Sequence, residues 1–109
     1  MEDSILNQRL NSIFNYDNLI AMKYLVNKDN ATWRILDGEA VIINNKTSFY
    51  YSLNRTGTYI WNLLLEKELS LEEIIEKVSI YYQQKKEDII DDIKKVLDDL
   101  AEEKLIEGR

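Results

Sequence analysis

Apolar residues between positions 31 and 53 occur in short runs that are separated by turn signals. Runs of this length, rich in β-branched and aromatic residues, predict strands at Ala31–Leu36, Glu39–Ile43 and Thr47–Leu53. Asp37–Gly38 is a strong signal for a two-residue hairpin between the first two strands. Asn44–Lys46 forms a second turn. The pattern therefore predicts a small antiparallel meander.

The remainder of the chain has a helical apolar period and predicts three helices. The first covers about Arg55–Glu66 and follows Asn54, whose side chain suits an N-cap. The second begins after Ser70, because Ser70 and Glu73 have the spacing of a capping box. The third covers about Glu87–Glu103 and is mainly acidic on its polar face.

The third helix carries more apolar surface than a single core-facing stripe needs. At about 100° per residue, a first compact stripe contains Ile89, Ile93, Val96 and Leu100. A second stripe beside it contains Ile90, Leu97 and Ala101 and is bordered by Lys94. Two interpretations stay open at this point. Either both stripes are core, with the N-terminal segment covering the second, or one stripe lines a groove for another chain.

Residues 1–28 differ in character from the rest and are interpreted as an N-terminal extension, followed by a domain over residues 29–109. The extension is rich in Asn and has apolar residues at near-helical spacing, which predicts a short amphipathic helix. A partly ordered extension is the alternative, because short helices are marginal without a packing partner.

Composition excludes several kinds of chemistry. The 109 residues suit one domain, and they include neither His nor Cys, so Ser-His pairs, Cys-His pairs and Cys-ligated zinc are ruled out. Adjacent acids on a helix point about 100° apart and make no chelate. We therefore expect no catalytic residue, no metal and no cofactor. The net charge of −6 disfavours nucleic acid as a partner. Without a membrane-spanning run or a signal peptide, the chain is expected to be cytoplasmic and not membrane-bound.

One composite pattern covers about two thirds of the chain. It contains the meander, then Tyr51, Leu53, Asn54, Thr56, Gly57, Ile60, Trp61, Leu63 and Leu64, then Leu71–Ile74, then an acidic helix that closes on Leu105 and Ile106. With this pattern the chain resembles, from Trp33 to Glu107, the PqqD-like family, which supplies the recognition element for ribosomally synthesised and post-translationally modified peptides (RiPPs). The resemblance implies an α+β fold, a small winged-helix-like domain with a three-stranded antiparallel sheet packed on three helices.

The resemblance also implies a function. Such a protein is a stand-alone, non-catalytic adaptor that binds the leader segment of a precursor peptide by strand addition. It presents that peptide to a modifying enzyme such as a radical SAM enzyme, a cyclodehydratase or a leader peptidase. Carried onto this sequence, the peptide-binding residues are Thr47, Ser48, Phe49, Tyr50 and Tyr51 on the third strand, and Ile90, Ile93, Lys94 and Leu97 on the third helix. Leu97→Asp or Ile90→Asp is expected to abolish binding and to leave the domain folded.

Other interpretations compete with this one. A winged-helix transcription regulator, or a regulator-binding protein, is compatible with the fold but needs a basic recognition helix, and the third helix is acidic. A small enzyme would have to work with carboxylates alone. The extension could fold over the groove, form a homodimer contact or dock the partner enzyme, and the sequence does not separate these roles.

Overall fold

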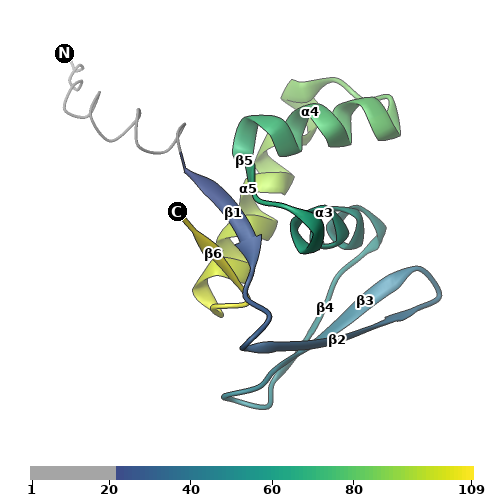
Figure 1. Cartoon of the computed structure of the whole chain (residues 1–109). Helices are drawn as coiled ribbons and strands as arrows, with labels where there is room; N and C mark the ends of the chain where they lie inside the picture. The colour runs from purple at the N-terminus through teal and green to yellow at the C-terminus, as the bar shows by residue number, and fades with distance from the viewer. Residues whose placement is uncertain (1–21) are drawn as a thin grey trace.

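The structure, a computed structural model, describes residues 22–109, which form an α+β domain (Figure 1). Within these residues, three helices pack with two three-stranded antiparallel sheets. The helices are α3 (Arg55–Glu66), α4 (Leu71–Tyr82) and α5 (Lys86–Glu102). The strands are β1 (Lys23–Val26), β2 (Ala31–Leu36), β3 (Glu39–Asn44), β4 (Tyr50–Ser52), β5 (Leu69–Ser70) and β6 (Ile106–Gly108). The predicted fold class is confirmed, and the helix predicted near the N-terminus lies outside the described residues.

The predicted meander is the β2–β3–β4 sheet. Asp37 and Gly38 both have positive φ, 53° and 80°, which is the backbone signature of the two-residue turn that their sequence predicts. The β2–β3 hairpin runs beneath α3 in the view of Figure 1, and its turn at Gly38 lies beside the side chain of Arg55, the first residue of α3. Its first two strands agree with the predicted ranges, apart from one added residue at Asn44.

The third strand is shorter than predicted. It covers only Tyr50–Ser52, whereas the sequence predicts Thr47–Leu53. Asn44 accounts for the difference, because its side-chain oxygen accepts hydrogen bonds from the backbone N–H groups of Lys46 and Thr47, at 2.9 and 3.2 Å. Ser48 then adopts a left-handed φ of 66°. The β3–β4 connection is therefore a longer loop, and the ladder begins only after it.

The second sheet, in the order β5–β1–β6, is absent from the sequence prediction. Its central strand, β1, pairs with residues far away in the chain, such as Tyr24 with Gly108. Val26 at the end of β1 is only 3% exposed and lies in the core. The predicted boundary after residue 28 therefore separates β1 from the sheet that it completes.

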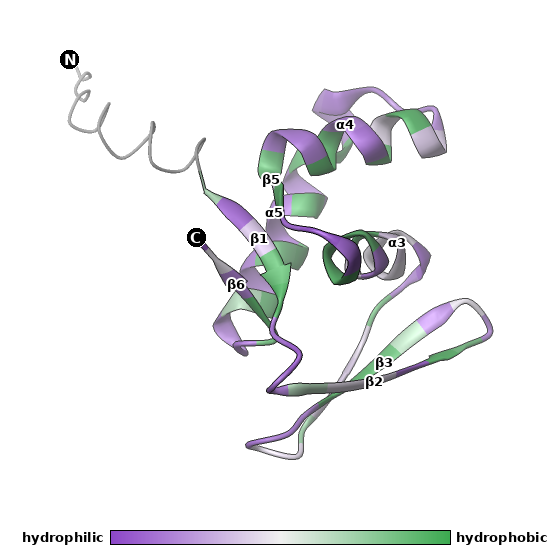
Figure 2. Ribbon diagram, viewed as in Figure 1, coloured by the Kyte–Doolittle hydropathy of each residue, from purple (hydrophilic) through white to green (hydrophobic). Residues whose placement is uncertain are grey.

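Helix α3 holds the meander against the rest of the domain. Trp61 is fully buried, and its ring meets that of Trp33 on β2 nearly edge-on, with centroids 5.8 Å apart. The Thr58 hydroxyl accepts a hydrogen bond from the backbone N–H of Ala40 at 2.8 Å. A Cβ on Gly57 would lie 3.2 Å from the Leu53 side chain, so glycine permits this close approach of helix and strand. Apolar and polar stretches alternate along all three helices (Figure 2), as one-sided burial requires.

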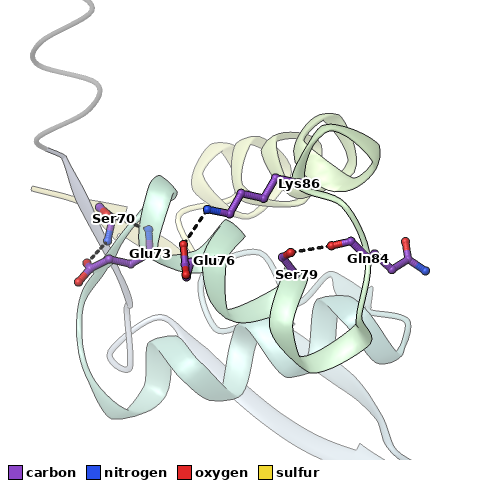
Figure 3. A network of polar contacts seen from close by, with 6 residues as sticks. All are labelled: Ser70, Glu73, Glu76, Ser79, Gln84 and Lys86. Carbon is purple, nitrogen blue, oxygen red and sulfur yellow. Dashed lines mark hydrogen bonds and ion pairs between the residues drawn. The ribbon is translucent and has the colours of Figure 1, made fainter.

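Local hydrogen bonds set both ends of α4 (Figure 3). At the start, Ser70 and Glu73 form the predicted capping box, with bonds of 2.9 and 3.1 Å. At the end, the Ser79 hydroxyl donates to the Gln84 carbonyl at 2.6 Å. Lys86 on α5 pairs with Glu76 on α4 at 2.7 Å, and this bond raises the pKa of Lys86 and lowers that of Glu76.

Ser70→Ala is expected to destabilise the domain by about 1 kcal/mol, because the first turn of α4 loses its side-chain acceptor. The change is measured as a lower midpoint in urea denaturation. Lys77→Ala is the control, since it truncates an exposed side chain in the middle of the same helix that takes no part in the capping box. An unchanged midpoint for Ser70→Ala would show that the box contributes nothing.

Candidate functional site

Strand β4 has a free edge in the part of the chain that the structure describes. It pairs with β3, with Tyr51 opposite Ile42 and Tyr50 opposite Ile43, and no described strand lies on its other side. A free edge presents a row of backbone N–H and C=O groups that can pair with an additional strand. The edge of β4 is therefore the place where this sheet can be extended.

The hydrogen bonds of the meander show which residues face that edge. The backbone N–H of Leu53 donates to the Ala40 carbonyl, and the Phe49 carbonyl accepts from β3, each at 2.9 Å. Bonded and non-bonded pairs alternate along antiparallel strands, so residues 49, 51 and 53 turn their backbone groups toward β3. The N–H and C=O groups of Tyr50 and Ser52 consequently point to the free edge.

Tyr51 connects β4 to helix α5. The pKa of Tyr51 is raised to about 12, first by burial, then by the proximity of its hydroxyl to the Asp99 carboxylate, and then by the negative charges of Glu103 and Glu102. All three acids lie in or directly after the last turn of α5. The C-terminal part of α5 therefore runs past β4 and presents carboxylates to it.

Two pockets lie at the two ends of β4. The first, of about 450 Å³, is where α3, α4 and α5 meet beside the end of the strand. Its apolar wall is formed by Ile60, Val78, Tyr82, Ile89, Ile93 and Val96. Its polar wall includes Asn54, Thr56, Gln84, Asp88, Asp92, Lys95 and Asp99. The second pocket, of about 270 Å³, lies beside the loop before the strand and is lined by Asn30, Asn44, Lys46, Thr47, Glu102, Glu103 and Lys104. We refer to the free edge of β4 and these two pockets together as the groove.

One face of α5 lines this groove. Asp88, Asp92 and Asp99 line the first pocket, and Glu103 lines the second. Intervals of four, seven and four residues place these acids on one side of the helix, with Val96 between them. We refer to Asp88, Asp92, Asp99 and Glu103 as the acidic stripe.

Comparison with known proteins places the chain in a family. The sequence model of the family described as coenzyme PQQ synthesis protein D (PqqD) matches residues 39–106. The chain belongs to the PqqD family. The resemblance inferred from the composite pattern of the sequence is thereby confirmed.

A solved structure supports the assignment of this PqqD-family protein. The fold is similar to that of TbiB1, which was solved in complex with the TbiA(beta) leader peptide. The two share 28% sequence identity and superpose with a TM-score of 0.67, over 76% of this chain and 94% of the TbiB1 chain. A search of curated protein sequences finds no match.

The five residues that were predicted to bind peptide from the third strand of this PqqD-family protein lie in several different environments. Thr47 lines the second pocket, whereas Ser48 has the left-handed conformation that ends the loop. Phe49 and Tyr50 are 69% and 73% exposed. Tyr51 is half-buried and faces α5. The structure thus gathers these residues along one edge, although only Tyr50 and Tyr51 of the five belong to the strand itself.

The residues predicted on the third helix do not form one open surface. Ile93 and Leu97 are 1% and 2% exposed and belong to the core. Ile90 and Lys94 line neither pocket. The predicted division into stripes is therefore wrong at two positions: Leu97 is buried with the first stripe, while Val96 is half-buried and lines the groove.

Of the α5 residues predicted to bind peptide, Ile93 lines the first pocket, and sequence reasoning missed the other α5 side chains that line the groove. Asp92, Val96 and Asp99 share a face, but that face looks like a solvated one because it is mostly acidic. The four-residue and three-residue intervals between them were a usable signal. Nothing local in the sequence showed that β4 would lie against this face.

The Tyr51 contact has a consequence at alkaline pH. Because the folded state raises the pKa of Tyr51 from 10.0 to about 12, its contribution to stability is complete below about pH 10 and is lost as the pH rises through 12. Tyr51→Phe should therefore lose less stability than the natural protein across this window. The measurement is urea denaturation at a series of pH values, with phenolate absorbance followed in parallel.

Asp99→Asn provides the check on the cause. This variant should lower the pKa of Tyr51, because it removes the negative charge that lies beside the Tyr51 hydroxyl. An unchanged phenolate titration in Asp99→Asn would contradict the contact.

The described part of the chain offers little else that suggests chemistry. Among residues 22–109, no three acidic side chains converge on a point where a metal ion could bind. No helix in the same range has the length and apolar character needed to cross a membrane.

Proposed function

We propose that this protein binds the leader segment of a ribosomally made precursor peptide, which adds as a strand to the free edge of β4 and lies in the groove against α5. The single observation that carries the proposal is the unpaired edge of β4 beside two pockets that α5 lines, in a chain of the PqqD family. The TbiB1 structure, which contains a leader peptide, supports the same type of ligand.

Strand addition suits the chemistry of this edge. The outward N–H and C=O groups of Tyr50 and Ser52 supply backbone hydrogen bonds that do not depend on the side chains of the ligand. Selectivity then comes from side chains that alternate along the added strand. Those on one side meet the groove and its two pockets, and those on the other side stay in solvent.

The protein acts as a non-catalytic adaptor that presents the attached core segment to a peptide-modifying enzyme. An extended peptide held by its leader leaves the following segment free to enter another active site. The partner would be an enzyme such as a radical SAM enzyme, a cyclodehydratase or a leader peptidase. Its docking surface would have to lie away from the β4 groove.

A calorimetric titration tests the binding step. The full-length protein is titrated with the synthetic leader of the short precursor peptide encoded nearest to its gene, and a scrambled leader serves as the control. Binding in the micromolar range or tighter, with loss of signal for the scrambled sequence, is the expected result. Equal heats for both peptides, or no heat from a folded protein, would contradict the proposal.

The adaptor step has its own test. Modification of the precursor by the neighbouring enzyme should be faster in the presence of the protein, and this gain should disappear when the leader is deleted. An identical rate with and without the protein would remove the adaptor role and leave peptide binding in place.

A further inference from the structure

The wall that α5 presents to the groove is negatively charged. Five acids and three lysines line the two pockets. Asp99 and Glu103, one helical turn apart, are the half-buried members of the acidic stripe, whereas Asp88 and Asp92 are exposed. Charges that are partly withdrawn from water interact more strongly with a partner than fully solvated ones. Asp99 and Glu103 are therefore the acids most affected by what occupies the groove.

The nearby lysines do not neutralise this pair. Lys95 contacts Asp99 at 3.2 Å, but its side chain is 76% exposed, and such surface pairs are weak. Among residues 22–109, no lysine or arginine nitrogen lies within ion-pairing distance of Glu103. On the strand side of the groove, the pKa of Tyr51 is raised mainly by burial and further by the nearby charges of Asp99 and Glu103.

The geometry of helix and strand sets the spacing of a matching ligand. Asp99 and Glu103 are four residues apart, which is about 6 Å along a helix. Side chains on one face of a strand repeat every two residues, which is about 6.7 Å. Consecutive groove-facing side chains of a strand added to β4 can therefore reach Asp99 and Glu103 in turn.

We infer that the peptide recognised by this groove carries two basic side chains, Lys or Arg, at alternate positions that face Asp99 and Glu103. The inference rests on the proposed function, since it specifies the chemistry of the strand that β4 receives. Backbone pairing along β4 aligns the peptide, and the two carboxylates select peptides with cations at this spacing. A peptide with acids at these positions is rejected, because it would meet half-buried like charges.

A selection experiment tests this preference directly, because it does not require the sequence of the natural leader. A phage-displayed random peptide library is selected on the immobilised full-length protein, and the enriched sequences are then synthesised. We expect Lys or Arg at two positions separated by one residue. Replacing both by Gln should weaken binding by roughly tenfold to a hundredfold, the range expected when charge-assisted hydrogen bonds are lost.

Variants of the protein assign the effect to the two carboxylates. The double variant Asp99→Asn/Glu103→Gln should bind the basic peptide more weakly by a similar factor. Its affinity for the peptide with two Gln residues should equal that of the natural protein. Asp91→Asn/Asp98→Asn is the matched control, because it removes two exposed charges of α5 that line neither pocket. Glu103→Gln alone keeps the Tyr51 contact and serves if the double variant is less stable.

The outcomes separate the inference from the function on which it rests. The inference is overturned if the selected peptides show no preference for Lys or Arg. It is also overturned if their affinity is the same for the natural protein and for the Asp99 and Glu103 variants. Neither result contradicts leader binding. If the selection enriches no peptide and the leader titration gives no heat of binding, both the inference and the proposed function are overturned.

Discussion

Leu97→Asp is expected to unfold the domain. The Leu97 side chain is 2% exposed and packs in the same cluster as Ile93 and Leu100. Removing a buried leucine costs about 2–5 kcal/mol, and an unpaired carboxylate in its place adds a desolvation penalty. Small domains have only about 5–15 kcal/mol of stability in total. Circular dichroism should therefore show no cooperative thermal transition, and any loss of peptide binding would be a consequence of unfolding.

Val96→Asp is the informative comparison, because it makes the same change at the neighbouring residue. Val96 is half-buried at the groove, so an aspartate there can keep its carboxylate in water. This variant should retain a cooperative transition. A folded Leu97→Asp protein beside an unfolded Val96→Asp protein would mean that α5 is rotated relative to the arrangement described above.

The buried position of Leu97 and the half-buried position of Val96 show which property of α5 cannot be predicted from its sequence. Helical periodicity correctly places Ile89, Ile93 and Leu100 in the core. It cannot decide which flank of that stripe is also covered, since Val96 and Leu97 border it on opposite sides. That decision depends on how α4 and β6 pack against α5, which the helical period of α5 does not encode.

Features with a local cause were predicted correctly. The Asp37–Gly38 turn and the Ser70–Glu73 capping box depend on residues within one turn of each other. The second sheet has no such signal, because β1 is four residues long and gains its partners only when the two ends of the domain meet. Short strands without alternating polarity are ambiguous until a partner exists.

The candidate site, like the fold, could be predicted from the sequence only in part. The sequence led to an edge that is unpaired in the structure, since the last strand of a meander has one free side, and Tyr50 and Tyr51 lie on it. On α5, Ile90 and Lys94 line neither pocket, and their role in peptide binding stays a prediction. An apolar surplus suggested a binding surface, whereas the face that lines the groove is mostly acidic.

Tyr50→Pro is expected to weaken leader binding by at least about tenfold while the domain stays folded, an effect of about 1.4 kcal/mol or more. The backbone N–H of Tyr50 points to the free edge and not to β3, so proline removes a donor that only an added strand would use. The proline ring also occupies the space in which the backbone of that strand approaches. Proline is tolerated on edge strands when its missing N–H would face outward.

Tyr50→Ala controls for the loss of the aromatic side chain, which is 73% exposed. Tyr51→Pro is the opposite control, because it removes a backbone group that faces β3 and should destabilise the meander itself. Calorimetric titration with the leader and thermal unfolding are measured for each variant. Ser52→Pro, at the other outward position, repeats the test independently. If both outward proline variants are folded and bind as tightly as Tyr50→Ala, the leader does not pair with β4, and a site elsewhere on the domain must hold it.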